Sequence, residues 1–391
     1  MRATALISTT GLVAASLLLA PTVQAGNKAP KSGKPVKAPV VLSTEVGAPF
    51  NLAVKGGRVL VADGGPGLVG LLKRDGSIKP IVADAPGAAG VDLAAGRLAF
   101  TTTETNYDTF ENTASGLHIW SPVKKWSKHK GKFWGHKPGV KKMGVKKVYA
   151  DTHAYEAARN PDQVNRYGVE NPSQCVIDAF TAAEFPYDYT GMVDSHAYSV
   201  VRAGGKWIVA DAGANTLWKI DDKGRISTLW VVPPQPAKIT PEAAEAFGFP
   251  DCVAGVTYGF EGVPTDVEVG RDGFLYVTTL PGGPESEVLG ARGKVWRVNP
   301  HTGKAKEIAG GFLGATNLAI GNRGEIYVAE LFGGRISVIK HGKISEYLSL
   351  PGVVAVESGR HGGLWAATMG NEDPPAPGTI VKISSGHKGN R

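Results

Sequence analysis

The sequence has little cysteine, little methionine and few charged residues for its length. Two cysteines and four methionines among 391 residues exclude a disulfide-dense scaffold and a zinc-finger array. Charged residues make up 20% of the chain and hydrophobic residues 42%, which excludes a disordered polymer and predicts a sizeable core. Beyond residue 25 no apolar run approaches the roughly 20 residues of a membrane helix. We therefore expect no transmembrane segment in the mature chain.

Glycine is abundant, with 52 residues, and 26 prolines accompany it without a collagen-like period, which indicates many turns. At the N-terminus, Arg2 precedes an apolar stretch from Leu12 to Ala20 that ends in Val23-Gln24-Ala25. This pattern predicts a secretory signal peptide over residues 1–25, cleaved near Ala25. Residues 26–39 are rich in Lys, Pro and Gly and are predicted to be a flexible leader. We therefore expect a secreted, extracytoplasmic protein.

One motif recurs from residue 40 onward: a polar residue with two or three apolar ones, a Gly-containing turn, then an apolar strand ending in a small and a polar residue. Its six copies begin at Phe50, Gly90, Ala197, Thr265, Thr316 and Val353. Most copies continue into a third and a fourth strand, and four antiparallel strands per copy predict a propeller blade.

The last copy supplies only three strands, ending with Gly378–Ser384, and Pro39–Val46 (PVVLSTEV) offers the fourth. We therefore predict an all-β, six-bladed β-propeller over residues 40–385, closed by an N-terminal strand that completes the last blade. Residues 386–391 form a tail. The alternative is an open β-sandwich or a pair of smaller sheets.

Several blade copies resemble a known superfamily. The stretches PTDVEVGRDGFLYV (Pro264–Val277) and VADAGANTLWKIDDKGRISTL (Val209–Leu229) resemble the NHL and regucalcin/gluconolactonase propellers. The stretches ADTHAYEAARNPD (Ala150–Asp162) and VPTDVEVGRDGFLYVTTLPG (Val263–Gly282) are similar to the ScyD/ScyE family of exported propellers. The likeness covers roughly residues 40 to 384, except the Lys-rich insertion and the loop around Cys175. It implies a six-bladed, exported propeller and no settled catalytic activity.

Polar residues that begin the first strand or end the second strand of each copy are expected to meet at one mouth of the axial channel. The first-strand positions are Asn51, Asp92, Tyr198, Asp266, Asn317 and Val354. The second-strand positions are Asp63, Thr102, Asp211, Thr279, Glu330 and Thr368. The sequence therefore predicts that these side chains line the channel.

Ca²⁺ takes six to eight oxygen ligands, so the carboxylates and amides of the first set are candidate ligands for Ca²⁺ in the axial channel. They are Asn51, Asp92, Asp266 and Asn317, and the regucalcin resemblance implies the same class of site. Tyr198 and Val354 interrupt this ring. In an enzyme, Asp211 or Glu330 would serve as general base. The alternative is a water-filled channel lined by polar residues.

Other catalytic motifs are absent or weak. The sequence contains no Gly-x-Ser-x-Gly elbow, HExxH helix or glycine-rich phosphate loop. The histidines fall in different copies, and His153 and His196 precede the third copy, where they could approach the channel mouth. These residues leave open a propeller lyase with a His-bound metal. The alternative is that they are ordinary solvated loop histidines.

Two long connections, residues 151–195 and 233–262, are predicted to cap the channel mouth and to have little core of their own. They contain the only cysteines, Cys175 and Cys252. In an exported protein this predicts a disulfide between them. Two separate buried thiols are the alternative.

The insertion 123–147 contains the run KKWSKHKGKFWGHKPGVKKMGVKK from Lys124 to Lys147, which has ten lysines and no acidic residue. The positive charge of this run is therefore larger than the net charge of the whole chain, which is +8. Lysines interleaved with aromatics predict contact with an anionic cell-wall polymer or membrane surface, and nucleic acid is disfavoured for an exported protein. The alternative is a solvated loop. The predicted contact residues are Lys124, Lys125, Trp126, Lys128, Lys130, Lys132, Trp134, Lys137, Lys141, Lys142, Lys146 and Lys147.

The sequence therefore favours a non-enzymatic binding protein. Its loop-capped face would take a small ligand or a protein partner, and its insertion would take an anionic surface. The alternative function is a Ca²⁺-dependent lactonase or hydrolase.

Overall fold

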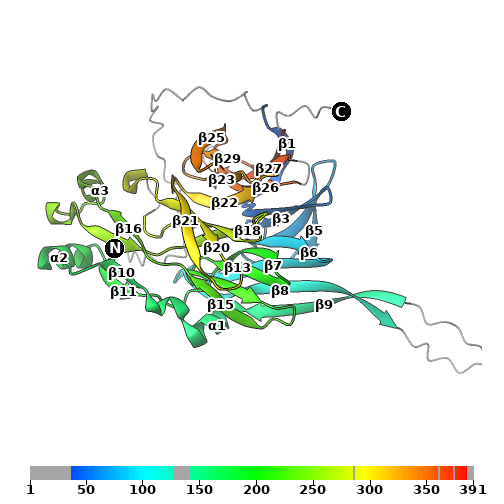
Figure 1. Cartoon of the computed structure of the whole chain (residues 1–391), viewed down its shortest axis with the longest axis horizontal. Helices are drawn as coiled ribbons and strands as arrows, with labels where there is room; N and C mark the ends of the chain where they lie inside the picture. Colours follow the sequence, from blue (N-terminus) through cyan, green and yellow to red (C-terminus); the bar gives the residue numbers. More distant parts are fainter. Residues whose placement is uncertain (1–36, 127–140, 285–286, 360–361, 373–374, 385–391) are drawn as a thin grey trace, which may run out of the picture.

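The computed structural model describes residues 37–126, 141–284, 287–359, 362–372 and 375–384. These residues form seven four-stranded sheets and one two-stranded sheet, all antiparallel, with three α-helices (Figure 1). The fold is all-β, as predicted.

Five of the four-stranded sheets are meanders in which each strand pairs with the next along the chain. The first sheet contains β2 (Asn51–Lys55), β3 (Arg58–Asp63), β4 (Leu68–Leu72) and β5 (Ile78–Val82). The second contains β6 (Val91–Ala94), β7 (Arg97–Asn106), β8 (Glu111–Trp126) and β9 (Lys141–Asp151). The third contains β12 (Ala197–Ala203), β13 (Lys206–Asp211), β14 (Thr216–Ile220) and β15 (Ile226–Val231). The fourth contains β18 (Pro264–Val269), β19 (Leu275–Thr279), β20 (Gly293–Val298) and β21 (Ala305–Phe312). The fifth contains β22 (Ala315–Ile320), β23 (Ile326–Glu330), β24 (Arg335–Lys340) and β25 (Lys343–Ser349).

The sixth sheet joins the two ends of the described chain. It contains β26 (Val353–Ser358), β27 (Leu364–Thr368), β30 (Gly378–Ile383) and β1 (Val40–Val46). The strands β28 (Asn371–Glu372) and β29 (Pro375–Ala376) form a small hairpin between β27 and β30. In the register of β1 and β30, Val40 pairs with Lys382 and Val46 with Gly378. The predicted pairing of the N-terminal strand with the last copy is confirmed.

The first strands of these six sheets lie next to one another in a closed cycle. The strands β2, β6, β12, β18, β22 and β26 contact one another in this order, and β26 contacts β2. Apolar residues of adjacent sheets fill the space between them; Ile208 and Leu217 of the third sheet, for example, pack with Val267 and Val277 of the fourth. We call this arrangement the ring, and it gives the molecule a propeller-type fold.

Glycine pairs make the tight hairpins of the ring. Gly56 and Gly57 between β2 and β3 have φ values of 59° and 77°, and Gly204 and Gly205 between β12 and β13 have 53° and 79°. Two consecutive positive φ angles are the signature of the two-residue hairpin turn that matches strand twist. The Gly-containing turns of the repeat therefore hold each first strand against its second strand.

The seventh four-stranded sheet was not predicted. Its order is β11 (Asp188–Thr190), β10 (Arg166–Val169), β17 (Thr257–Phe260) and β16 (Gln235–Lys238). Together with α2 (Gln174–Ala182), α3 (Pro241–Ala246) and the 3₁₀ turn η2 (Asp251–Val253), it forms what we call the side unit. The helix α1 (Thr152–Arg159) and the turn η1 (Pro161–Val164) lead into it, and η3 (Glu287–Leu289) lies beside α3.

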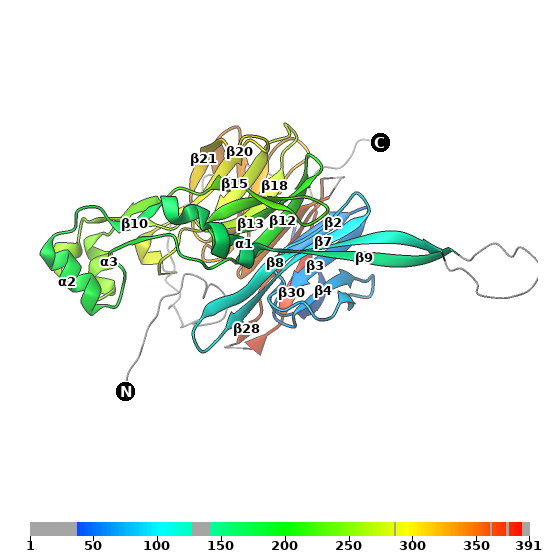
Figure 2. The same cartoon turned by 90° about the horizontal axis from the view of Figure 1, so that it is seen from below.

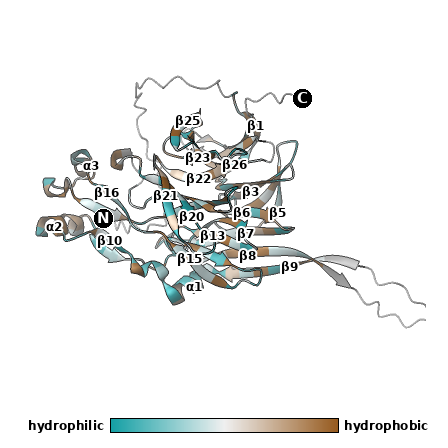
Figure 3. Cartoon of the chain, viewed as in Figure 1, coloured by the Kyte–Doolittle hydropathy of each residue, from teal (hydrophilic) through white to brown (hydrophobic). Residues whose placement is uncertain are grey.

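The side unit has its own apolar core, which corrects the expectation that the two long connections have little core. Val176, Phe180, Val253, Tyr258 and Phe260 are buried together in it, because short strands from both connections pair with one another. Figures 1 and 2 show the side unit extending outward from one side of the ring. Its helix α2 carries both hydrophobic and hydrophilic residues (Figure 3). The predicted disulfide is present and joins Cys175 of α2 to Cys252 of η2.

The hairpin β8–β9 extends from the ring on the side opposite the side unit (Figures 1 and 2). Its register runs without interruption from Gly116 opposite Asp151 to Trp126 opposite Lys141. With 16 and 11 residues, its two strands are longer than the sequence predicted for the third and fourth strands of that copy. None of the helices in the described ranges is long and apolar enough to cross a membrane.

Candidate functional site on the axis of the ring

The predicted axial residues tie neighbouring first strands together. Asp92 Oδ2 accepts a hydrogen bond from the backbone N–H of Arg202 at 3.0 Å. In the same way, Asp266 Oδ2 accepts from Leu318 N at 2.9 Å, and Asn317 Oδ1 accepts from Val356 N at 2.8 Å. Each bond joins one first strand to the next strand of the ring, so these side chains satisfy backbone donors that the antiparallel ladders leave unpaired.

Bulges decide which residues occupy equivalent positions on the first strands. In the third sheet Ala197 pairs with Asp211 and Ser199 with Ala210, so Tyr198 is the extra residue; Val354 is skipped in the same way in the sixth sheet. Ser199 therefore takes the position of Asp266 in the register. The predicted ring position of Tyr198 is corrected, because a bulge shifts every later residue by one.

Next to these polar contacts, apolar side chains from several sheets of the ring pack together. The rings of Phe50 and Tyr198 lie 5.7 Å apart, and the two residues are only 8% and 4% exposed. Val354 belongs to the same apolar cluster and is 1% exposed. Tyr198 thus does more than narrow a channel, because it packs inside a closed core.

Asp266 receives side-chain bonds from two other sheets. Asn51 Nδ2 lies 3.5 Å from Asp266 Oδ1, and Ser199 Oγ donates to the same oxygen at 2.5 Å. Asn51 belongs to the first sheet and Asp266 to the fourth, so their contact spans the axis. Burial raises the pKa of Asp266 to about 6, although the bonds from Ser199 and Leu318 act in the opposite direction. The axis is closed at this level by polar contacts.

Three further axial residues, Lys55, Glu268 and Glu357, were missed by sequence reasoning, and they lie with the predicted Asp92. On each first strand, one residue occupies the place that Asp266 has in the register of the fourth sheet. Two residues further along the strand, the second, fourth and sixth sheets have Asp92, Glu268 and Glu357. Lys55 Nζ lies 3.5 Å from Asp92 Oδ1, and the Lys55 side chain is 42% exposed. Period-two spacing from Asp266 to Glu268 was the available signal. We call these four residues the axial charge cluster.

The axial charge cluster contains its own cation. Burial opposes the charge of Lys55, but Asp92, Glu268 and Glu357 outweigh it and hold the pKa of Lys55 above its ordinary value. Burial raises the pKa of Glu357 from 4.5 to about 8, with Lys55 acting against it. Burial and the neighbouring Glu357 carboxylate raise the pKa of Glu268 well above its ordinary value. The lysine ammonium offsets part of the carboxylate charge on the axis.

The predicted Ca²⁺ ligands do not fit a cation site. Oxygens of Asp92, Asp266 and Asn317 accept backbone N–H groups, and Lys55 supplies positive charge at Asp92. Within the part of the chain that the structure describes, no three His, Cys, Asp or Glu side chains are grouped to hold a metal ion. We derive no chemistry through an axial metal.

The two candidate general bases lie in saturated structural networks. Asp211 accepts bonds from Ser195 Oγ at 2.6 Å, Trp218 Nε1 at 2.7 Å and His196 N at 2.6 Å, and it is 0% exposed. Glu330, also 0% exposed, is bound by Arg335 Nε at 2.9 Å, by the Ser337 hydroxyl and by Leu313 N at 2.7 Å. Both carboxylates fix the loop that enters their own sheet.

The predicted histidines belong to different elements. His153 lies in α1, whereas His196 directly precedes β12, with its ring 5.7 Å from that of Tyr198. Burial lowers the pKa of His196, with Asp211 acting in the opposite direction. Another histidine, His118, stacks on Phe100 at 4.6 Å, and burial lowers its pKa to about 4. Burial therefore favours the neutral form of His118 and His196, which suits packing inside the fold.

The structure describes only some of the residues that are predicted to contact an anionic surface. Lys146 and Lys147 on β9 are exposed, and the Lys147 ammonium lies 4.0 Å from the ring centroid of Trp120. By register, Lys124, Lys125 and Trp126 end β8, and Lys141 and Lys142 begin β9. The remaining predicted residues, Lys128, Lys130, Lys132, Trp134 and Lys137, lie outside the described residues.

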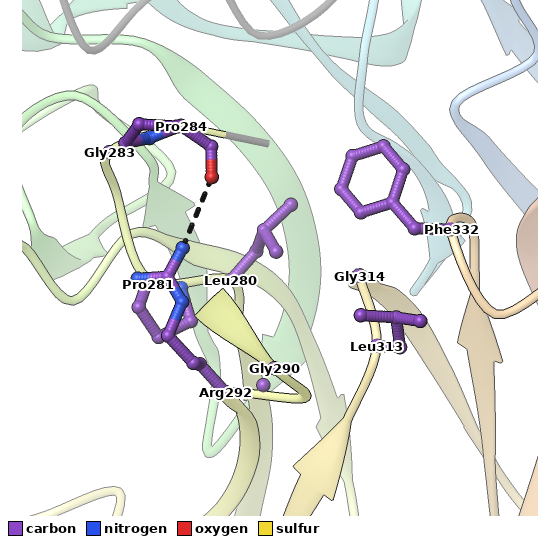
Figure 4. A pocket seen from close by; sticks show the side chains of 10 residues that line it. Leu280, Pro281, Gly283, Pro284, Gly290, Arg292, Leu313, Gly314 and Phe332 are labelled. Atoms are coloured by element: carbon purple, nitrogen blue, oxygen red, sulfur yellow. Dashed lines mark hydrogen bonds between the residues drawn. The ribbon is translucent and has the colours of Figure 1, made fainter. Parts of the chain in front are cut away.

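A small cavity lies away from the axis, beside the loops that lead into β20 and β22. Figure 4 shows Arg292 and Phe332 among the residues around it, and its volume of about 20 Å³ holds little more than one water molecule. Arg292 also borders an open groove of about 450 Å³ beside β16 and β21. Its guanidinium donates to the Gly282 carbonyl at 3.0 Å, and burial lowers its pKa to about 10. Neither space contains a predicted site residue.

The class of protein that this architecture defines is a β-propeller. No family model matches the chain, and no curated protein matches it. Among solved structures the chain is similar to a virginiamycin B lyase from Staphylococcus aureus, with 14% identity, 89% of this chain and 85% of that chain covered, and a TM-score of 0.44.

A putative glucose dehydrogenase from Thermus thermophilus is 14% identical over 89% of this chain and 99% of that chain, with a TM-score of 0.49. Regucalcin from Agrobacterium tumefaciens, described as a calcium-binding protein, is 13% identical over 47% of this chain and 57% of that chain, with a TM-score of 0.33. Likenesses at this level concern the fold alone, since propellers host many unrelated functions.

Proposed function

We propose that the protein is an exported, six-bladed β-propeller that binds an anionic lipid surface through hairpin β8–β9 and performs no catalysis. The closed cycle of six first strands supports six blades, and the seventh sheet belongs to the side unit rather than to the ring. Export rests on the signal-like N-terminus of the sequence. The ScyD/ScyE resemblance agrees with both parts of this proposal.

The observation that carries the proposal is the register of the hairpin. Lys125 stands opposite Lys142, and Trp126 stands opposite Lys141, in a part of the hairpin well beyond the other strands of the sheet. The register therefore places several lysines of the sequence at the outer end of the described hairpin. A concentration of lysines of this kind attracts an anionic surface.

Apolar groups accompany the lysines on the described part of the hairpin. Val145 is 53% exposed and Tyr149 is 44% exposed, close in sequence to the exposed Lys146 and Lys147. Lysines attract anionic headgroups, while aromatic and aliphatic side chains partition into the headgroup region of a bilayer. A purely hydrophilic polyanion makes no use of the apolar side chains, so we favour a lipid surface over a cell-wall polymer.

The enzyme alternatives lack support. A lactonase needs a Lewis-acidic ion or a free base, but Asn51, Asp92, Asp266 and Asn317 are engaged with protein groups. Asp211 and Glu330 are saturated with hydrogen bonds. In the described part of the chain, neither His153 nor His196 belongs to a group of three His, Cys, Asp or Glu side chains that could hold a metal ion. The predicted small ligand or protein partner at the channel mouth also finds an axis filled by Phe50 and Tyr198.

Vesicle co-sedimentation tests the proposal. The mature protein is expected to bind vesicles of phosphatidylglycerol and phosphatidylcholine, but not vesicles of phosphatidylcholine alone. Replacing Lys141, Lys142, Lys146 and Lys147 together by Gln is expected to weaken binding by up to roughly a thousandfold, at about 1 kcal/mol per lysine near the surface. The matched control replaces Lys73, Lys79, Lys340 and Lys343 by Gln, which removes the same charge elsewhere on the ring.

Equal loss of binding in both variants would mean that net charge alone attracts the protein, and the hairpin would not be the site. Binding to a soluble anionic polymer with no binding to vesicles would replace the lipid surface by a polymer.

A further inference from the structure

Buried carboxylates elsewhere in the ring are held by a basic group or by several hydrogen-bond donors; Asp211, for example, accepts bonds from Ser195, His196 and Trp218. Asp92 pairs with Lys55 at 3.5 Å, and Glu330 pairs with Arg335 at 2.9 Å. One pair differs: at the base of the side unit, Glu156 and Asp162 are 0% exposed. None of the ion pairs among the described residues involves Glu156 or Asp162. Buried charges in proteins are paired or coordinate metals.

Three side-chain oxygens in one short segment have no hydrogen-bond partner. They are Glu156 Oε1, Asn160 Oδ1 and Asp162 Oδ1, each hidden from solvent. The second oxygens of the two carboxylates are engaged, since Asp194 N donates to Glu156 Oε2 at 3.0 Å and Asn215 Nδ2 donates to Asp162 Oδ2 at 3.1 Å. A buried acceptor without a donor costs about 1–3 kcal/mol, so three in one segment point to a missing positive group.

We propose that Glu156, Asn160 and Asp162 hold a hard divalent cation, Ca²⁺, at the base of the side unit. Two carboxylate oxygens and one amide oxygen form a donor set made only of oxygen, which suits Ca²⁺ and not Zn²⁺ or copper. Backbone carbonyls and water complete such a set. In the described chain, no three His, Cys, Asp or Glu side chains are grouped to hold a metal ion. The set proposed here differs because its third ligand, Asn160, is an amide.

The neighbouring backbone holds two of these side chains in place. Asn160 Nδ2 donates to the Gly191 carbonyl at 2.9 Å, which turns its amide oxygen away from that carbonyl. A Cβ on Gly191 would lie 2.2 Å from the carboxylate carbon of Asp162. Only glycine permits this approach, so position 191 brings Asn160 and Asp162 to the same stretch of backbone.

The surrounding charges agree with a missing cation. Burial, followed by Asp211 and Asp162, raises the pKa of Glu156 to about 9. Burial also raises the pKa of Asp162 to about 7, with Glu261 and Asp211 adding to it and the bond from Asn215 opposing it. The same Asn215 amide donates to Glu261 Oε2 at 3.2 Å.

The position of the site gives it a structural consequence. Asp162 precedes β10, Glu261 follows β17, and Asn215 lies in the turn between β13 and β14 of the ring. The chain therefore enters and leaves the side unit at this point. A cation here orders the segment that leads from the ring into the side unit, while the Cys175–Cys252 bridge joins α2 to η2 within the side unit.

Calorimetric titration of chelator-treated mature protein with CaCl₂ tests the site. We expect one Ca²⁺ per chain and a melting temperature that rises with Ca²⁺ concentration, because an ion that binds only the folded state stabilises it by mass action. Glu156→Gln and Asp162→Asn are expected to weaken binding by more than about tenfold. Glu268→Gln, which changes a partly buried carboxyl of the axial charge cluster, is expected to leave binding unchanged.

The same variants test whether this position binds a cation or is only an empty cavity. Without Ca²⁺, Asp162→Asn is expected to melt at a higher temperature than the wild type, since it removes an unpaired buried charge, and to gain nothing from Ca²⁺. The proposal is overturned if wild-type protein binds no Ca²⁺, or if its melting temperature is the same in chelator and in excess CaCl₂. Loss of binding in Glu268→Gln alone would place the ion on the axis instead.

Discussion

Single polar side chains on the first strands connect one sheet of the ring to the next. Asp92, Asp266 and Asn317 each accept a backbone N–H from the following first strand. The residue types that suit a metal site also suit this task, because both need oxygen atoms in a buried place. Residue type alone cannot separate the two roles; the neighbouring N–H groups do.

Asp266→Ala tests the structural role of this side chain. The change leaves donors of Asn51, Ser199 and Leu318 without an acceptor in a buried place. We expect a loss of about 3 kcal/mol in the free energy of unfolding, measured by urea denaturation. The control Asp108→Ala alters an exposed residue and should change stability little. A chelator-sensitive stability that disappears in Asp266→Ala would instead indicate an axial metal.

The axial charge cluster predicts a pH dependence of stability. Burial raises the pKa of Glu357 from 4.5 to about 8, so between these values the folded chain holds a proton that the unfolded chain has lost. Stability from this group is present below pH 4.5 and declines as pH rises toward 8. In Glu357→Gln this part of the decline should disappear, as measured by denaturation across that range. An unchanged pH profile in the variant would contradict the assignment.

At the scale of strands and helices, the sequence predicts elements better than register. The alternation and the Gly turns correctly place the first and second strands of all six copies. The bulges at Tyr198 and Val354 were not predictable, because one extra residue leaves the apolar pattern of the strand intact. The sequence pattern aligns Asp92 with Asn51, but in the structure Gly90 occupies the position equivalent to Asn51. The Gly90 carbonyl accepts a hydrogen bond from Thr101 N at 3.0 Å.

The side unit escaped prediction for a different reason. Its strands have three or four residues each and pair across two segments that are far apart in the sequence. Strands this short give almost no periodic signal. Only the cysteine pair pointed to an association of the two segments, and the disulfide between them is confirmed.

Removing the disulfide tests its contribution to this element. The bridge closes a sequence separation of 77 residues, and replacing Cys175 and Cys252 by Ser should cost about 2–4 kcal/mol. We expect the loss to appear in the side unit first, as new protease cleavage within 166–190 and 235–260 while the ring stays intact. Simultaneous cleavage throughout the ring would show that the two parts unfold as one.

At the scale of the whole molecule, the ring depends on the pairing of its two ends. The strand β1 is the outer strand of the sixth sheet, and β30 has no other partner on that side. The sequence supported this closure because the last copy lacks one strand and residues 39–46 supply one. The positions of the side unit and the hairpin on opposite sides of the ring followed from neither composition nor motif.

Deleting residues 26–46 tests the closure. The deletion leaves the edge of β30 exposed, and exposed edges invite pairing between chains. We expect loss of most of the soluble monomer and a clearly lower melting temperature, compared with deletion of residues 26–36, which lie before the first described strand. A stable monomer without β1 would show that closure adds little.

The central claim is that the basic hairpin binds an anionic lipid surface, and the salt dependence of vesicle binding by the wild-type protein tests it most directly. If the lysines of β8–β9 make the contact, binding to phosphatidylglycerol vesicles should fall steeply between about 0.05 M and 0.5 M NaCl, because the Debye length shrinks over this range. The lysine-to-glutamine hairpin variant should show a much flatter dependence. Binding that is insensitive to salt, or equally steep in that variant, would contradict the account.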